Sequence, residues 1–188
     1  MSLELAILGA LALGDKLLPD MTTSINYKHW ESTNDWRRCK RCKDMHGKIW
    51  QIEEKADPEP PLHPNCRCMI VLMDAIRAGT ATINGIDGAD WTLQNVGELP
   101  DYYVEFEYAE SIGWKRGKWP SNVVPGKMIT GGIYRNDDGH LPDAKGRIWY
   151  EADINYKIGK RNDQRVVWSN DGLIFVTYDH YKTFYEIV

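Results

Sequence analysis

The feature of this chain that most constrains its fold is an alternation of apolar and polar residues between Arg147 and Val188. Strands have this period of two, and it predicts four of them: Arg147–Tyr156, Arg165–Asn170, Leu173–Tyr178 and Thr183–Val188. Asn170-Asp171-Gly172, between the second and the third, is a strong hairpin-turn signal. Upstream, Glu105 to Gly113 has the pattern of a helix that ends at a glycine. Helices followed by antiparallel strands predict an α+β fold.

The first predicted strand presents two faces of different character. Trp149, Glu151, Asp153 and Asn155 share one face, and Tyr150, Ala152, Ile154 and Tyr156 share the other. The second set is the more apolar, so we expect it to face the core and the first set to face solvent. A meander of strands can bring Glu151, Arg165 and His180 onto one concave face, although each of them is unremarkable by itself.

Three segments of this region carry a family resemblance. They are Gly146-Arg147-Ile148-Trp149-Tyr150-Glu151-Ala152-Asp153-Ile154-Asn155-Tyr156, Arg161-Asn162-Asp163-Gln164-Arg165 and Thr177-Tyr178-Asp179-His180-Tyr181. With Pro125-Gly126-Lys127 and other short blocks, they resemble the barnase-like family of guanyl-preferring bacterial ribonucleases from about Gly85 to Val188. The resemblance implies a barnase-like domain in which N-terminal helices pack on an antiparallel β-sheet.

The resemblance also implies a chemistry. It is that of a metal-independent endoribonuclease, which cleaves single-stranded RNA by transesterification to a 2′,3′-cyclic phosphate. Glu151 would be the base that takes the 2′-hydroxyl proton, and His180 would be the acid that protonates the leaving 5′-oxygen. Arg161 and Arg165 would offset the phosphate charge. Tyr181 would bond to the phosphate or stack beside it.

Guanine preference in this family comes from a loop whose backbone amides and one carboxylate read the base edge. The corresponding loop here is 134–139. Asn136 matches the family's asparagine, whereas Asp138 stands where the family has glutamate, so its carboxylate is one methylene shorter.

Other positions depart from the family. Phe106 replaces a lysine that the family uses near the phosphate, Asp137 replaces an arginine of the base-recognition loop, and Gly132 replaces an aspartate at the mouth of the site. We therefore expect weaker substrate binding than in a typical member. Arg135 and Lys127 are the residues that could compensate for the lost cations.

All four cysteines lie in the first half of the chain, as Cys39-x-x-Cys42 and Cys66-x-Cys68. The residues between them, 57–65, cannot form a helix because proline recurs. Two close cysteine pairs separated by a loop are the usual pattern of a structural zinc site. His63 or His46 could replace one cysteine as a ligand. Two disulfides or four free thiols are the alternatives.

This cysteine-rich segment has a resemblance of its own. Trp30-Glu31-Ser32, Arg38-Cys39 and Pro61-Leu62-His63-Pro64-Asn65-Cys66-Arg67-Cys68 resemble the C-terminal end of phage minor head, or head-morphogenesis, proteins. The resemblance implies a phage-like or toxin-delivery context. We therefore divide the chain into an N-terminal helical segment (1–29), a cysteine-rich, zinc-binding module (30–78) and a ribonuclease-like domain (79–188). Within the connection, Asp74 to Arg77 can continue as a helix.

Composition limits the partners. The net charge of −4 disfavours broad nonspecific RNA binding, so any cationic surface must be local. No apolar run is long enough to span a membrane, and the apolar run Leu3 to Leu13 lacks the basic start of a signal peptide. We expect a protein that is secreted or delivered without a recognisable signal peptide, or associated with a virion, and that acts in the cytoplasm. Alternatively, the chain is a fragment of a longer protein.

Two functions from different classes remain, beside a third in which the chain is a zinc-stabilised adaptor that docks its N-terminal half to a larger assembly. The first is an active ribonuclease at the toxin or effector end of a phage-like or polymorphic-toxin protein, blocked by an acidic barstar-like inhibitor or immunity protein. The alternative is a catalytically weak phage structural or docking module that uses a nuclease-like domain for binding. Retention of Glu151, both arginines and His180 favours the first, because a decayed site would have lost at least one of them.

Overall fold

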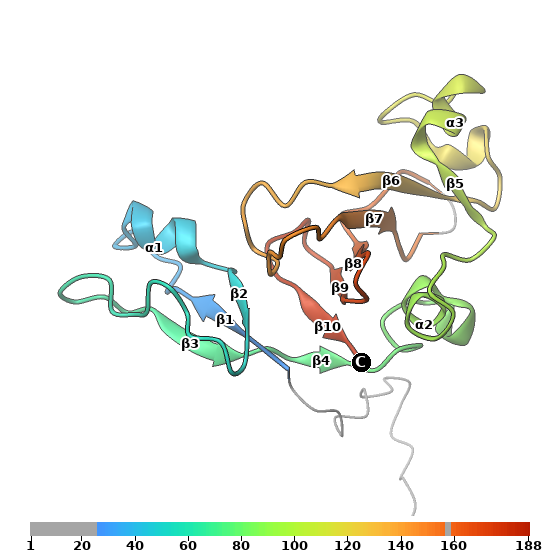
Figure 1. Cartoon of the computed structure of the whole chain (residues 1–188). Helices are drawn as coiled ribbons and strands as arrows, with labels where there is room; N and C mark the ends of the chain where they lie inside the picture. Colours follow the sequence, from blue (N-terminus) through green and yellow to red (C-terminus); the bar gives the residue numbers. More distant parts are fainter. Residues whose placement is uncertain (1–25, 157–158) are drawn as a thin grey trace, which may run out of the picture.

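The computed structural model describes residues 26–156 and 159–188 (Figure 1). Its first half is a three-stranded antiparallel sheet in the order β2-β1-β3, with α1 between the first two strands of the chain. These elements are β1 (Tyr27–Glu31), α1 (Lys40–Met45), β2 (Ile49–Gln51) and β3 (Met69–Leu72). We call residues 26–72 the N-terminal module. Most of the N-terminal helical segment expected at 1–29 lies outside the described residues, and Tyr27 to His29 belong to β1 rather than to a helix.

The second half is built on a seven-stranded sheet in the order β4-β10-β9-β8-β7-β6-β5. Its strands are β4 (Ala75–Ile76), β5 (Tyr103–Glu105), β6 (Met128–Tyr134), β7 (Trp149–Asp153), β8 (Arg165–Ser169), β9 (Ile174–Thr177) and β10 (Tyr185–Ile187). Neighbouring strands from β6 to β10 pair antiparallel. Each edge strand is parallel to its neighbour: β4 to β10, and β5 to β6. The helical elements are η1 (Gly85–Asp87), α2 (Ala89–Asn95), α3 (Phe106–Ser111) and η2 (Pro120–Asn122). The expected mixture of helices and antiparallel strands is confirmed.

The local sequence signals led to the right elements in most places. All four predicted strands form, and Gly172 in the predicted hairpin turn has a φ of +94°. The predicted helix is α3, which ends before Gly113, where φ is +105°. The helical continuation from Asp74 to Arg77 is wrong, because β4 pairs with β10 through Ala75 and Ile76. Helix α2 was not predicted.

The seven-stranded sheet has a core on each face. On one face, Leu93 of α2 packs with Ala152, Val166 and Val176. On the other face, Trp149, Val167 and Phe175 pack against Tyr27, Ile49 and Met73 of the N-terminal half. The rings of Tyr27 and Phe175 meet edge to face at 5.4 Å. The two halves of the chain therefore share one hydrophobic core.

This second core corrects one prediction. The face of β7 that carries Trp149 was expected to be solvated, but Trp149 is 5% exposed and Asp153 is fully buried. The N-terminal module covers Trp149, and two arginines neutralise Asp153. Only part of this face, around Glu151, stays open. Among the described residues, no helix is long and apolar enough to cross a membrane.

Candidate active site

An open groove of about 480 Å³ lies where the connection after β6 faces β7 and the turn between β9 and β10. Its lining includes six predicted site residues, together with Tyr134, His140 and Lys182. The six are Glu151, His180, Tyr181, Asn136, Asp138 and Arg135. The structure thus brings the predicted base, the predicted acid and the predicted base-recognition loop around one hollow.

Glu151 occupies the middle of β7, and two neighbours fix its carboxylate. The hydroxyl group of Tyr181 donates a hydrogen bond to Glu151 Oε2. On the other side, Gly131 leaves the space that the carboxylate fills, because a Cβ atom at that position would collide with Glu151 Oε1. Strand β6 has a register irregularity between Thr130 and Gly132, where Gly132 has a φ of +74°. Gly132, which stands where the family resemblance implies an aspartate, thus lies at a bulge of β6.

His180 and Tyr181 stand on a tight turn organised by Asp179. Both have left-handed backbones, with φ of 60° and 66°, which costs about 1–2 kcal/mol per residue. The Asp179 carboxylate accepts hydrogen bonds from the backbone of Lys182 and Thr183, at 3.1 and 2.9 Å, and so offsets that cost. Burial raises the pKa of Asp179, but these hydrogen bonds lower it by more, so its pKa lies below the ordinary value. The turn exposes the His180 side chain to the groove.

The predicted phosphate-binding arginines lie beside the groove rather than in its lining. Both hold Asp153, which is fully buried. Arg161 donates to its carboxylate at 2.6 and 2.7 Å, and Arg165 Nε lies 3.0 Å from Oδ1. Burial lowers the pKa of Arg161, but Asp153 raises it by more, so the guanidinium stays charged. Sequence reasoning missed Asp153, although a carboxylate two residues after Glu151 on the same strand face was the available signal.

Arg161 and Arg165 line a second hollow of about 250 Å³, together with Arg116. Phe106, which replaces a family lysine, packs edge to face against Trp114 at 5.2 Å. The guanidinium of Arg116 lies over the Phe106 ring, 4.5 Å from its centroid. A cation therefore still lies next to the position of the lost lysine, supplied from the loop after α3. Sequence reasoning missed this replacement, because no local pattern marks Arg116.

The predicted base-recognition loop is held by its asparagine. Asn136 donates to the Leu141 carbonyl at 3.0 Å and accepts from the Leu141 amide at 3.1 Å. Asp138 is exposed at the groove, and Arg135 forms an exposed ion pair with Asp137 at 3.4 Å. Lys127, expected to support phosphate binding, instead donates to the Asp101 carbonyl at 2.8 Å and is not in the groove lining.

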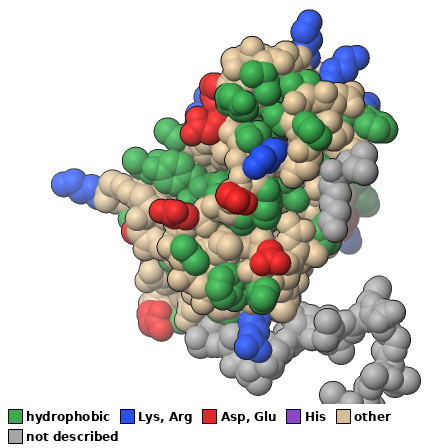
Figure 2. Space-filling view, turned by 90° about the vertical axis from the view of Figure 1, so that its right-hand side faces the viewer, with side chains coloured by type: hydrophobic (Ala, Val, Ile, Leu, Met, Phe, Trp, Pro, Cys, Tyr) green, Lys and Arg blue, Asp and Glu red, His purple; other side chains and the backbone are tan. Residues whose placement is uncertain are grey.

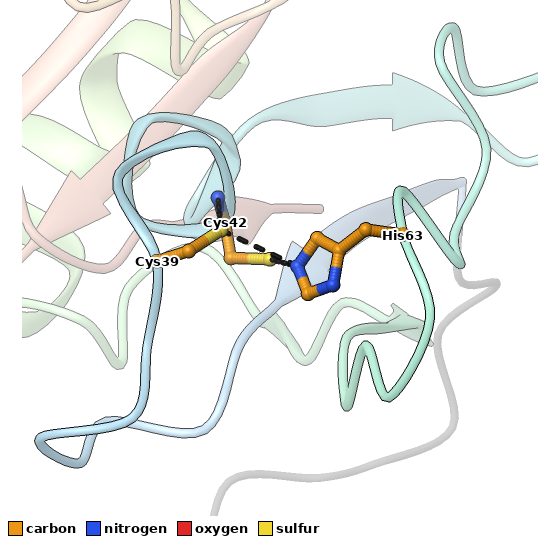
Figure 3. Close-up of side chains that lie close together, drawn as sticks. All are labelled: Cys39, Cys42 and His63. Atoms are coloured by element: carbon orange, nitrogen blue, oxygen red, sulfur yellow. Dashed lines mark hydrogen bonds between the residues drawn. The ribbon is translucent and has the colours of Figure 1, made fainter.

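The cysteines converge in the N-terminal module, and Figure 3 shows two of them, Cys39 and Cys42, next to His63. Cys39, Cys42 and His63 form one close group, and Cys42, Cys66 and Cys68 form another. His63 Nε2 lies 3.3 Å from the sulfur of Cys39 and 3.3 Å from that of Cys42, and the Cys42 and Cys66 sulfurs are 3.7 Å apart. All four cysteines are free thiols, so the disulfide alternative does not describe this structure. The cluster could hold a metal ion.

Hydrogen bonds from neighbouring groups orient the cluster's side chains and affect the pKa of Cys66. His63 Nδ1 bonds to the Pro64 carbonyl at 2.9 Å, which leaves Nε2 as the lone-pair nitrogen that faces the thiols. Burial raises the pKa of Cys66, but hydrogen bonds from the backbone of Cys68 and Leu62 lower it to about 6. Arg67 binds Asp35 through two hydrogen bonds of 2.7 Å and so ties the two cysteine pairs together. His46 is no part of the cluster, because its Nδ1 accepts from the Ser32 amide at 3.2 Å.

A carboxylate and an imidazole share an open groove, with guanidinium groups in the adjoining hollow, and these are the residue types that acid–base cleavage of a phosphodiester uses. Comparison with known proteins identifies the class of enzyme. Residues 88–188, more than half of the chain, match the family model described as ribonuclease, and the chain belongs to this family. It is an endoribonuclease.

Individual relatives agree with this assignment. The chain is 46% identical over 108 residues to a ribonuclease of Heyndrickxia coagulans, an alignment that covers 57% of this chain and 99% of the relative. Ribonucleases of Bacillus intermedius and Bacillus pumilus are equally similar, over 67% of their length. Residues 20–71 match the model of Phage Mu protein F like proteins. Both sequence resemblances are thus confirmed.

Proposed function

We propose that this ribonuclease cleaves single-stranded RNA without a catalytic metal, by transesterification to a 2′,3′-cyclic phosphate. Glu151 takes the proton of the ribose 2′-hydroxyl, whose oxygen then forms a bond to the adjacent phosphorus. His180 gives a proton to the departing 5′-oxygen as the phosphorus–oxygen bond breaks. The observation that carries the proposal is that Glu151 and His180 line one open groove, with Glu151 held by Tyr181.

The charge that develops on the phosphate is offset by the neighbouring guanidinium groups. Arg161 and Arg165 are fixed by Asp153, so little reorganisation is needed when substrate binds. Arg116 adds a third cation in place of the family lysine. This replacement favours an active enzyme over the alternative of a weak docking module.

Guanine preference is the second part of the proposal. Asn136 forms two hydrogen bonds with Leu141 and so fixes the shape of the loop. In this proposal the backbone amides of the loop face the base. Asp138 would accept hydrogen bonds from the guanine edge. Because it is one methylene shorter than the family's glutamate, we expect a weaker preference for guanine than in the relatives.

The test is cleavage of defined RNA in excess EDTA, with the products analysed for terminal cyclic phosphate. The expected result is cyclic phosphate on the 3′ side of guanosine, formed at the same rate with and without chelator. A requirement for added magnesium would overturn the mechanism. Equal cleavage of the dinucleotides GpU, ApU, CpU and UpU would overturn the base preference alone.

We also propose that the cysteine cluster holds one structural zinc ion, bound by four of Cys39, Cys42, His63, Cys66 and Cys68. Tetrahedral zinc with bonds of about 2.3 Å sets its sulfurs about 3.8 Å apart, and the Cys42 and Cys66 sulfurs lie 3.7 Å apart. When bound, the ion would contribute folding free energy to the N-terminal module. Elemental analysis should find one zinc per chain, and Cys42→Ser should abolish it. Wild-type protein without zinc would refute the site.

The biological setting is the third part. We propose that this ribonuclease is the effector part of a phage-like or polymorphic-toxin protein and acts in the cytoplasm. A producing cell then needs an acidic inhibitor that inserts carboxylates among the groove's cations. Expression of the chain alone should arrest growth, and co-expression with the adjacent gene should restore it. Harmless expression of an enzyme active in vitro would overturn the toxin role.

A further inference from the structure

The densest positive charge of the chain lies outside the ribonuclease half. Residues 36–43 read Trp-Arg-Arg-Cys-Lys-Arg-Cys-Lys, which is five cations and no acid in a protein of net charge −4. They form the start of α1 and the turn before it. We call five of these residues the α1 basic patch: Trp36, Arg37, Lys40, Arg41 and Lys43.

The patch is exposed and has few internal partners. Trp36 is 91% exposed, the highest value among the large hydrophobic residues of the described ranges, and the Arg37 guanidinium lies 5.6 Å from its ring centroid. Lys40, Arg41 and Lys43 are exposed, and within residues 26–156 and 159–188 no hydrogen bond or ion pair engages their side chains. Within the patch, Arg37 forms an ion pair at 3.7 Å with Asp35, the nearest preceding acid, which Arg67 also binds at 2.7 Å. A tryptophan so exposed contributes nothing to the core, which points to a ligand.

The N-terminal module contacts the catalytic groove through the residues that follow α1. Helix α1 leads directly into Gly47, where a Cβ atom would lie 3.4 Å from both the His140 ring and the Lys182 carbonyl of the groove lining. The Ile49 amide donates to the His140 carbonyl at 2.8 Å. The Lys48 side chain reaches the Gly139 position at 4.0 Å. Two lysines thus lie at the junction of the N-terminal module and the groove: Lys182 in the groove lining and Lys48 next to Gly139.

The opposite side of the molecule has a different character. In the view from the side of α2 and α3, acidic and basic side chains are interspersed among hydrophobic ones (Figure 2). No comparable run of cations occurs elsewhere in the sequence. The concentration of positive charge next to α1 is thus local.

We infer that the α1 basic patch is a second binding surface for the single-stranded RNA substrate, which holds phosphates and one base beyond the nucleotides in the groove. This inference rests on the proposed cleavage of RNA in that groove. Cations that follow a phosphate backbone and an exposed aromatic ring that stacks on a base are the two devices by which proteins bind single strands. Because the nearby groove is the proposed site of RNA cleavage, one strand can contact both surfaces, which favours RNA over an acidic peptide or an anionic membrane as the occupant.

The test compares a short and a long substrate. The dinucleotide GpU fills only the groove, whereas a 12-nucleotide RNA with a single guanosine can reach past Gly47 to α1. Two variants alter the patch: the single variant Trp36→Ala, and a triple variant that combines Lys40→Ala, Arg41→Ala and Lys43→Ala. The matched control removes three exposed lysines elsewhere: Lys55→Ala, Lys115→Ala and Lys145→Ala.

We expect kcat/KM for the long RNA to fall about tenfold in Trp36→Ala, the effect of one lost stacked base. The triple variant should reduce the slope of log binding against log salt by about 2, because each phosphate contact to a single strand contributes about 0.7. Cleavage of GpU should not change in either variant. The control variant should cleave both substrates like the wild type. Long-RNA cleavage at the wild-type rate by both patch variants would overturn the inference.

A binding measurement separates this inference from the proposed reaction. The inactive variant His180→Ala, with and without the patch substitutions, is titrated with labelled 12-nucleotide RNA, an acidic peptide of equal charge and anionic vesicles. RNA affinity that depends on the patch supports the inference, whereas patch-dependent binding of only the peptide or the vesicles overturns it. If wild-type protein fails to cleave GpU, the proposed mechanism fails, and this titration still decides the role of the patch.

Discussion

Tyr181 donates a hydrogen bond from its hydroxyl group to the carboxylate of Glu151, across the gap between the β9–β10 turn and β7. Burial, and then the nearby Glu151, raise the pKa of Tyr181, so the hydroxyl keeps its proton throughout the neutral range. The ring of Tyr134 stacks on Tyr181 with centroids 5.0 Å apart and limits its movement. The position of the proposed base therefore depends on a second residue that needs no contact with RNA.

Tyr181→Phe should lower kcat about tenfold, because a lost hydrogen bond to a charged group costs about 1.5 kcal/mol or more. Tyr178→Phe is the control. Its hydroxyl donates to the Ala81 carbonyl at 2.9 Å, away from the groove lining, so its activity should stay at the wild-type level. Steady-state cleavage of GpU measures both. Equal rates for the two variants would show that the bond does not position Glu151.

Glu151→Ala and His180→Ala should each reduce the rate by about 100- to 10,000-fold, the usual contribution of a positioned base or acid. Both side chains line the open groove, so each variant should keep its fold. Single-turnover cleavage and thermal unfolding test the two claims separately. Near-normal rates in either variant would remove that residue from the mechanism.

Asp153→Asn should lower the free energy of unfolding by about 3–5 kcal/mol, because it leaves two arginines beside a buried neutral group. Asp171→Asn is the matched control. It breaks the ion pair with Arg147 at 2.8 Å, but Asp171 is 45% exposed, so we expect a loss of only about 0–1 kcal/mol. Urea unfolding provides the comparison. Similar losses in both variants would mean that burial of Asp153 has little energetic weight.

Gly131→Ala should reduce kcat/KM by about 100-fold, because its Cβ atom displaces the Glu151 carboxylate, and small misplacements have effects of that size. In the adjacent control, Gly132→Ala, the added Cβ meets no atom within 4 Å. That control should lose about 1–2 kcal/mol of stability through its left-handed backbone and keep most of its activity. A larger loss of activity in Gly132→Ala than in Gly131→Ala would contradict the assigned role of Gly131.

Glu186→Gln should stabilise the protein at pH 7 and have no effect below pH 4. Burial raises the pKa of Glu186 above its ordinary value, although a hydrogen bond from Asn26 opposes the rise. The folded state thus binds the proton more tightly than the unfolded state, and stability falls as pH rises from about 4.5 through the folded pKa. Glutamine keeps an acceptor for Asn26 and has no charge. Urea midpoints at the two pH values test the difference, and an equal change at both would refute it.

Local signals in the sequence predicted the elements whose pattern is self-contained. The strands from β7 to β10 follow from alternation, and the hairpin between β8 and β9 follows from Asn170 to Gly172. Strand β4 could not be predicted in this way, because Ala75 and Ile76 take their conformation from β10, which is distant in the sequence. The burial of Trp149 depends likewise on Tyr27 and Met73 in the other half of the chain.

The same limit applies to the site. Family resemblance placed Glu151 and His180 correctly in one groove, because the segments that carry them are similar to those of the relatives. It did not predict Asp153 as the shared partner of two arginines, nor Arg116 beside Phe106. These are contacts between side chains from separate loops and strands, which only the folded chain brings together.

The pairing of β4 with β10 has a consequence for how the protein folds. Ala75 and Glu186 are partners about 110 residues apart in the chain, and such non-local contacts form late, because a long loop must close first. The N-terminal module and the catalytic sheet also share a core, so neither can complete its packing on the ribosome before β10 has emerged. We therefore expect the two halves to unfold and refold together in one cooperative step. A nuclease built in this way acquires its finished groove only after β10 has been synthesised.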